Sequence, residues 1–194
     1  IKATQRGEAS ITIDGMPDEK AWEAAPLSSD FTQNDGQPAT KAAGRFKVIY
    51  DDQAVYLAVW CDEPNVDGIQ ASRVAGWRIQ YLDHLLLVID ESGTRSEKTI
   101  LATTIHGQAA MFDFGHQWHK GYEVKAAKHE SGWTAEFRIP TAKLDETLKP
   151  RPGTRWNINL SRLRANKDGK PESTAWHPSL EMFSPRYTGE LFFE

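Results

Sequence analysis

Short apolar segments separated by turn residues recur along almost the whole chain, and this spacing constrains the fold more than any other feature. Within 133–139, apolar residues at odd positions alternate with polar residues at even positions, which is the period of a half-buried strand. The predicted strands cover residues 11–13, 44–50, 54–61, 83–90, 98–104, 108–114, 122–129, 133–139, 155–163 and 187–193. Strands at such spacing predict an all-β fold, a two-sheet antiparallel β-sandwich that is jelly-roll-like, with one or two short helices.

Local signals also predict how these segments are connected. Residues 16–22 and 140–144 favour short helices. The segment 54–61 is apolar on both faces, so we expect it to lie between two layers. Turn pairs join neighbouring strands into hairpins at 51–52, 106–107 and 131–132.

Length, charge and cysteine content narrow the class of protein. A chain of 194 residues with 39% hydrophobic residues can bury one sizeable core, so we expect a single domain over 1–194 with its core in about 11–193. A net charge of −4 without a basic stripe gives no support for a nucleic-acid partner, and no apolar run is long enough for a membrane span.

The single cysteine, Cys61, excludes an internal disulfide and is predicted to be buried. The chain begins at Ile1 without a signal-peptide pattern, so we expect a processed protein or part of a larger one.

Motifs for common catalytic chemistry are missing from the sequence. It contains no glycine-rich phosphate loop, no Gly-x-Ser-x-Gly elbow and no His-Glu-x-x-His pair. The chain has enough carboxylates to supply the catalytic pair of a glycosidase, but nothing in the sequence identifies which two would form it. We therefore predict a protein that is not an enzyme, with hydrolysis as an open alternative.

Metal ligands are available but follow no known spacing. His116 and His119 lie three residues apart in a predicted loop, where solvated histidines are the simpler interpretation. The carboxylates of 51–52, 62–63 and Asp67 offer oxygen ligands for calcium. A structural calcium is therefore an expected cofactor, without assigned ligands.

The chain has seven tryptophans, and their local sequences divide them into two groups. Trp77 and Trp118 lie in polar loops, where a ring either anchors the loop or is exposed. An exposed indole suits a sugar, because the apolar C–H face of a pyranose stacks on the ring. Arg78, Gln80 and Asp83 are close enough in sequence to Trp77 to bond hydroxyl groups. The others are assigned to core or structural positions: Trp22, Trp60, Trp133, Trp156 and Trp176.

Several short motifs occur in a characteristic order. They are Ile11-Thr12-Ile13-Asp14-Gly15 with Trp22, Tyr50-Asp51-Asp52 before Val55-Tyr56-Leu57, the strand 83–90, Gly132-Trp133 with Glu136 and Ile139-Pro140, Trp156-Asn157 with Asn159 and Arg162, Trp176 with Pro178, and Gly189 with Leu191. In this order the chain resembles the family 9 carbohydrate-binding modules over about 11–193. The resemblance implies a β-sandwich, structural calcium, and the end of a glycan chain gripped between two tryptophan rings. It also implies a secreted, periplasmic or cell-surface protein of bacterial type that serves a glycan-degrading system.

The chain departs from this family at both clamp positions. The first clamp tryptophan would stand at Gln80, with Trp77 three residues earlier, and the region of the second contains Phe183 but no tryptophan. Arg162 has the strand parity of apolar residues, so its charge must pair with Asp83 or with a ligand, and we favour a structural pair. The predicted sugar-binding residues are Trp77, Arg78, Gln80, Asp83, Trp118, Arg162 and Phe183.

The sequence thus predicts non-catalytic binding of a polysaccharide or oligosaccharide through aromatic platforms, with modest affinity because a shallow site makes few contacts. A catalytic domain in a larger parent protein is an expected partner. One alternative is a structural or protein-interaction domain of the same fold without a sugar site. Another is a haem-binding, cytochrome-like sandwich that would use Met111 or Met182 with a histidine as axial ligands.

Overall fold

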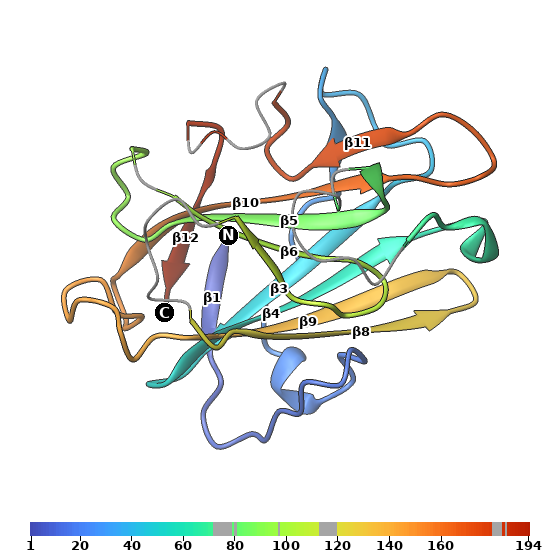
Figure 1. The fold of residues 1–194 in the computed structure, drawn as a ribbon. Helices are drawn as coiled ribbons and strands as arrows, with labels where there is room; N and C mark the ends of the chain where they lie inside the picture. Colours follow the sequence, from blue (N-terminus) through green and yellow to red (C-terminus); the bar gives the residue numbers. More distant parts are fainter. Residues whose placement is uncertain (72–78, 80, 97, 113–119, 180–183, 185) are drawn as a thin grey trace.

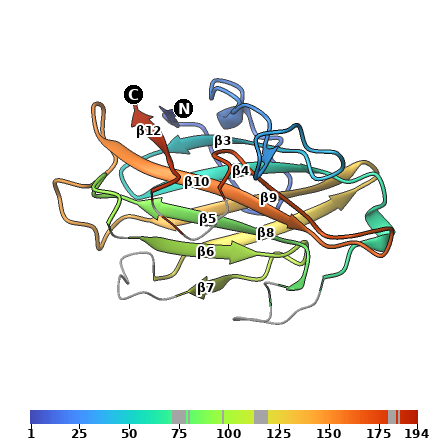
Figure 2. The same cartoon turned by 90° about the horizontal axis from the view of Figure 1, so that it is seen from above.

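Two β-sheets face each other in the computed structural model, which describes residues 1–71, 79, 81–96, 98–112, 120–179, 184 and 186–194 (Figure 1). The first sheet has the order β7 (Ala110–Phe112), β6 (Thr99–Thr103), β5 (His84–Asp90), β10 (Arg155–Arg164) and β12 (Gly189–Phe193). Beside β10 it also includes β11 (Glu172–Ala175), which pairs with β2 (Thr32–Gln33). The second sheet has the order β3 (Gly44–Tyr50), β4 (Ala54–Asp62), β9 (Gly132–Pro140) and β8 (Glu123–His129). Figure 2 shows β7, β6, β5 and β10 side by side.

Two single turns of 3₁₀ type, η1 (Lys20–Trp22) and η2 (Val66–Gly68), are the helical elements that lie wholly within the described residues. The predicted β-sandwich with short helices is therefore confirmed. None of the described helices has the length and apolar character that crossing a bilayer requires.

A short N-terminal strand, β1 (Lys2–Gln5), joins the two sheets at one edge. Its first half pairs with β12 and its second half pairs with β3, and both pairings are parallel. The other strand pairs of the sandwich are antiparallel, as predicted. β1 itself was not predicted, because a strand this short gives no periodic signal in the sequence.

Some predicted elements differ from the structure. The segment 11–13 is not a strand, and Ile11 and Ile13 instead pack against the outer side of β4. The helix expected over 140–144 is replaced by turns, because the N–H of Thr141 donates to the carbonyl of Gln53 and continues the β9 pairing. The helix expected over 16–22 is reduced to η1. β2 and β11 lie in segments without a strand signal and form by pairing beside β10.

The main core lies between the sheets, and a second cluster covers the outer side of β4. Odd-numbered residues of β4 face the main core, whereas Tyr56 and Ala58 pack with Trp22 and Ala25 from the N-terminal segment. Both faces of β4 are therefore covered, which confirms its predicted position between two layers.

The core assignments of the tryptophans are mostly confirmed. Trp22, Trp133 and Trp156 are buried. Trp60 is only partly buried, at the edge of the outer cluster. Trp176 packs edge-on against Phe46, with ring centroids 5.2 Å apart.

Glu136, a buried carboxylate of β9, fastens the N-terminal segment to the second sheet. One of its oxygens accepts hydrogen bonds from the N–H groups of Asp14 at 3.2 Å and Gly15 at 2.9 Å. The other accepts from the indole N–H of Trp22 at 3.2 Å, which also donates to Glu19 at 3.1 Å. Burial, with the nearby negative charge of Glu19, raises the pKa of Glu136 to about 7.

This raised pKa predicts a pH dependence of stability. Between the ordinary value of 4.5 and the folded-state pKa of about 7, the folded chain binds more protons at Glu136 than the unfolded chain. The free energy of unfolding should therefore fall as the pH rises through this window, and Glu136→Gln should remove that part of the change. Urea denaturation of both proteins across the window measures the difference. Identical pH profiles for the two proteins would show that Glu136 does not titrate there.

Cys61 lies on the inner face of β4 and is buried, as predicted. Burial raises the pKa of its thiol to about 12. The thiol is therefore a packing group in the main core rather than a nucleophile.

Candidate functional site

Arg162 of β10 and Asp83, the residue before β5, form the ion pair that the sequence analysis favoured. Nη2 of Arg162 lies 3.0 Å from Oδ2 of Asp83, and neither side chain is exposed. Burial raises the pKa of the Asp83 carboxyl, and the Arg162 guanidinium opposes that rise. The guanidinium also lies 5.8 Å from the ring centroid of Trp133. The pair is thus an interior contact, and direct contact of either residue with a sugar stays a prediction.

This pair is part of a larger charge network at one end of the sandwich. Glu63 accepts hydrogen bonds from Arg162 at 3.1 Å and from two nitrogens of Arg164 at 2.8 and 2.7 Å. Arg164 also donates twice to Asp168, which lowers the pKa of Asp168 to about 2. Lys41 lies 3.1 Å from the same carboxylate. The negative charges of the network therefore each have a cationic partner, as burial requires.

The network fixes both ends of the segment 71–82. The backbone N–H of Asp83 donates to the carbonyl of Gln70 at 2.8 Å, and the N–H of Gln70 donates to the carbonyl of Ala165 at 2.8 Å. At the same point the Asp83 side chain is held by Arg162. The two residues that flank this segment, Gln70 and Asp83, are therefore held next to each other beside the end of β10.

A second long segment, 178–186, is held by an asparagine on the outer face of β10. The side-chain amide of Asn159 donates to the carbonyls of His177 at 2.8 Å and Tyr187 at 2.9 Å. Its oxygen accepts from the N–H of His177 at 3.0 Å. Ile158 and Leu160, the residues on either side, face the main core. Both ends of the segment are therefore fixed on the outer face of the first sheet.

Comparison with protein-family models matches residues 13–179 to the family described as carbohydrate family 9 binding domain-like. The chain belongs to this family. It is similar in structure to a family 9 carbohydrate-binding module from Caldicellulosiruptor kristjanssonii. With the cellotriose complex it shares 18% identity at a TM-score of 0.75, covering 100% of this chain and 94% of that chain. With the glucose complex it shares 19% identity at a TM-score of 0.76, covering 100% and 95%. No match was found among curated proteins.

Most residues predicted to bind sugar in this family 9 domain lie outside the described residues: Trp77, Arg78, Gln80, Trp118 and Phe183. The described ends of their loops still show which strands carry them. The segment 71–82 ends at β5 and the segment 178–186 is held on β10, and these two strands are paired. The loop with Trp118 follows β7, which is separated from β5 by β6. The structure therefore brings the loops of Trp77 and Phe183 to neighbouring strands and starts the loop of Trp118 at the sheet edge.

The family 9 domain also has two exposed tyrosines that the sequence analysis did not select. Tyr81 is 74% exposed and Tyr187 is 45% exposed. Each lies beside one of the fixed loop ends described above. They were not predicted because a tryptophan in a polar loop is the stronger signal for a stacking platform, although an aromatic residue just before a strand was a usable signal.

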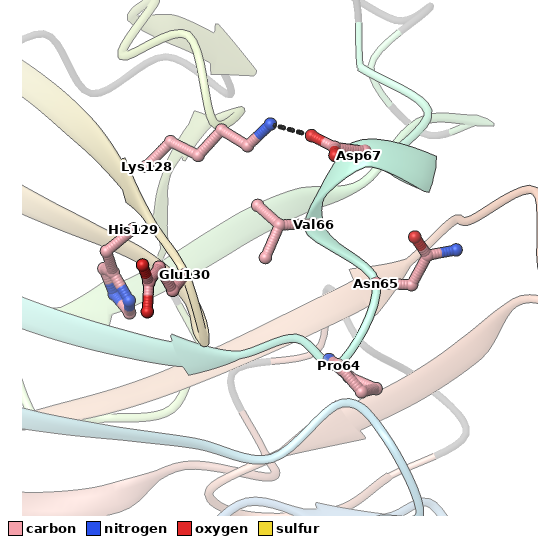
Figure 3. A pocket seen from close by; sticks show the side chains of 7 residues that line it. All are labelled: Pro64, Asn65, Val66, Asp67, Lys128, His129 and Glu130. Atoms are coloured by element: carbon pink, nitrogen blue, oxygen red, sulfur yellow. Dashed lines mark hydrogen bonds and ion pairs between the residues drawn. The ribbon is translucent and has the colours of Figure 1, made fainter.

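An open groove of about 560 Å³ lies beside η2 (Figure 3). Pro64 and Val66 lie on one side, and Lys128 and His129 of the β8–β9 hairpin lie on the other. Lys128 reaches Asp67 in an ion pair of 2.7 Å. No tryptophan, tyrosine or phenylalanine is among the described residues that line the groove, so it lacks the platform that sugar stacking needs.

Four of the five carboxylates considered for calcium are paired with cations in the structure. Among the described residues, no group of three or more histidine, cysteine, aspartate or glutamate side chains could hold a metal ion. Each of four candidates instead pairs with a cation: Asp51 with Arg6, Asp62 with Arg45, Glu63 with Arg162 and Arg164, and Asp67 with Lys128. The structural calcium stays a prediction.

The side chains considered as histidine metal ligands or as axial ligands of a haem lie outside the described part of the structure. His116, His119 and Met182 lie outside the described residues, and Met111 is described only in its backbone. The haem-binding alternative therefore gains no support from the described part of the chain.

Proposed function

We propose that this chain is a non-catalytic carbohydrate-binding module that recognises a polysaccharide or oligosaccharide. The observation that carries this proposal is the family match over residues 13–179. The similar module from Caldicellulosiruptor kristjanssonii was solved with cellotriose and with glucose, so glucose and its oligomers are the first ligands to test.

We place the proposed site on the outer face of the first sheet. The ends of segment 178–186 are fixed there and Ile79 of segment 71–82 packs on the same face, which reduces the conformational entropy that a bound ligand would have to remove. Asn34, Ser173 and His177 are at least partly exposed beside the buried Asn159 and Ser161, and they offer hydrogen-bonding groups for sugar hydroxyls. In this arrangement the Arg162–Asp83 pair acts as a positioning contact at the end of the segment that contains Trp77.

Titration calorimetry with glucose, cellotriose and a panel of other oligosaccharides tests the proposal. Saturable binding is expected for the wild type, and Trp77→Ala should weaken it at least about tenfold by removing a stacking platform. Trp118→Ala is the matched variant. The loop that contains Trp118 follows β7, which is separated from β5 by β6, so we expect a smaller loss of sugar affinity for this variant. Circular dichroism checks that each variant is folded.

Two results would count against this placement. Equal affinity of Trp77→Ala and wild type would move the site away from the segment 71–82. No heat with any sugar would favour the alternative, a structural or protein-interaction domain that has kept the family fold without the sugar site.

We further infer from the family that the module works outside the cytoplasm or at the cell surface, beside an enzyme that degrades glycans. Fractionation of the producing cells, with an antibody against this chain, tests the location. Recovery of the chain only from the cytoplasm would contradict the inference.

A further inference from the structure

The N-terminal segment covers only part of the outer face of the second sheet (Figure 1). Along β4, the outward residues Tyr56 and Ala58 are buried under this segment. The next outward residue, Trp60, is only partly buried, and the side chain of Asp62 is 51% exposed. The cover therefore ends at Trp60, which stands at the border between the covered and the open part of this face.

The partners of Trp60 in the two neighbouring strands show on which side its ring is open. On β9 the partner is Thr134, which is buried and donates its hydroxyl to the carbonyl of Gly15 at 2.5 Å, so the N-terminal segment lies over this side. On β3 the partner is Arg45, whose side chain is 37% exposed. Trp60 is therefore open toward β3 and toward the end of β4.

On this open side, a guanidinium group and two carboxylates offer hydrogen-bonding groups. Nη2 of Arg45 lies 3.1 Å from one oxygen of Asp62, and Nε of Arg45 lies 3.6 Å from Asp30. Nη1 of Arg45 and the indole N–H of Trp60 have no acceptor among the described residues, so both are available as donors. Neighbouring hydroxyl groups of a sugar can bind side by side to such guanidinium and carboxylate groups.

The charges and the shape of this surface indicate the class of ligand. The positive charge of Arg45 is more than balanced by Asp30 and Asp62, so an acidic sugar gains no free cation there. A neutral sugar offers hydroxyl groups for the charged side chains and an apolar C–H face for the indole. A protein partner would need a larger apolar patch, and in the described part of β3, β4, β8 and β9 no large apolar side chain is fully exposed.

We propose that Trp60, Arg45 and Asp62 form a second contact site for a neutral glycan, with Trp60 as its stacking platform. This site lies on the outer face of the second sheet, on the opposite side of the sandwich from the site proposed on the first sheet. A module with both sites can hold two segments of one polysaccharide, and its binding to a polysaccharide then exceeds its binding to a short oligosaccharide. The inference rests on the proposed carbohydrate binding and adds a separate site to it.

Nuclear magnetic resonance of the wild type labelled with nitrogen-15 tests the inference without a substitution in the site. Titration with cellotriose and the other oligosaccharides of the panel should shift the indole N–H signal of Trp60 and the amide signals of residues 44–46 and 60–62. The spectrum of Trp60→Leu identifies the indole signal. Oligogalacturonate, an acidic probe, should leave the same signals in place.

Retention on the insoluble polysaccharide of the sugar that binds, cellulose in the case of cellotriose, measures what the second site contributes. Trp60→Leu keeps an apolar side chain against the outer cluster and removes the platform. It should weaken retention about three- to tenfold, the range for one lost stacking contact. Leu27→Ala is the control, because Leu27 is exposed and lies outside the strands of the second sheet, and it should be retained like the wild type. Thermal melts check that each variant is folded.

The outcomes separate this inference from the proposed function. If a sugar shifts other signals but not those of Trp60 and its neighbours, the inference fails while the proposed function stands. Equal shifts of the Trp60 signals by oligogalacturonate and by a neutral sugar would likewise contradict a site for neutral glycans. If no sugar in the panel shifts any signal, the proposed function and this inference fail together.

Discussion

Replacing Arg162 with methionine is expected to lower the free energy of unfolding by about 3–5 kcal/mol, the cost of breaking a buried ion pair from one side. The change leaves the Asp83 carboxylate buried without its cation and takes one hydrogen bond from Glu63. Methionine is long and apolar, so the uncompensated charge rather than an empty volume dominates the loss. Urea denaturation followed by tryptophan fluorescence measures the change.

Two further variants test this explanation. Arg155→Met removes an exposed arginine from the same strand and should cost less than about 1 kcal/mol. Combining Arg162→Met with Asp83→Leu should recover part of the lost stability, because no unpaired carboxylate then remains at position 83. A cost for Arg162→Met no larger than that of Arg155→Met would mean that the buried network does not stabilise the fold.

Arg162→Met also has a local consequence for the proposed site. Arg162 holds Asp83, whose N–H closes the ends of the segment 71–82 against Gln70. Hydrogen exchange at the Asp83 amide should therefore quicken more than exchange in the middle of β10. Equal quickening at both places would indicate global destabilisation alone.

Gly132→Ala should destabilise the protein by about 2–3 kcal/mol, as overpacking in a tight interior does. A methyl group at this position would lie 2.1 Å from the carbonyl oxygen of Cys61, in the neighbouring strand β4. β4 cannot easily yield, because both of its faces are packed. The N–H of Glu63 also donates to the carbonyl of Ser131, so a shifted hairpin would disturb the charge network.

Chemical denaturation compares this variant with a matched glycine substitution. Gly169 has open space where a Cβ would stand, so Gly169→Ala should change the stability by no more than about 0.5 kcal/mol. Similar stabilities for Gly132→Ala and Gly169→Ala would show that the β8–β9 hairpin adapts without cost.

β10 connects the interior of the sandwich to its proposed binding face. Its inward residues include Arg162 and Arg164, which hold the charge network next to Asp83, the residue that follows the segment 71–82. Its outward residue Asn159 holds both ends of the segment 178–186. One strand therefore holds residues at the ends of both segments.

Much of the fold was predictable because its signals are local. The alternation in 133–139 and the turn at 131–132 both act over a few residues, and they correspond to β9 and its hairpin with β8. The inward direction of Arg162 followed from strand parity, and its pairing with Asp83 followed from the need of a buried charge for a partner. The resemblance to family 9 carbohydrate-binding modules depended on the order of such local motifs.

Contacts between distant residues were decided only when the chain folded. Arg164 binds Glu63 across 101 positions of sequence, and Glu136 accepts from Gly15 across 121, and no local pattern indicates either partner. The ends of the segments 71–82 and 178–186 likewise come to neighbouring strands only because β5 and β10 pair. Side-chain period and turn chemistry act between near neighbours and therefore appear in the sequence, whereas the partners of buried charges depend on which strands become adjacent in three dimensions.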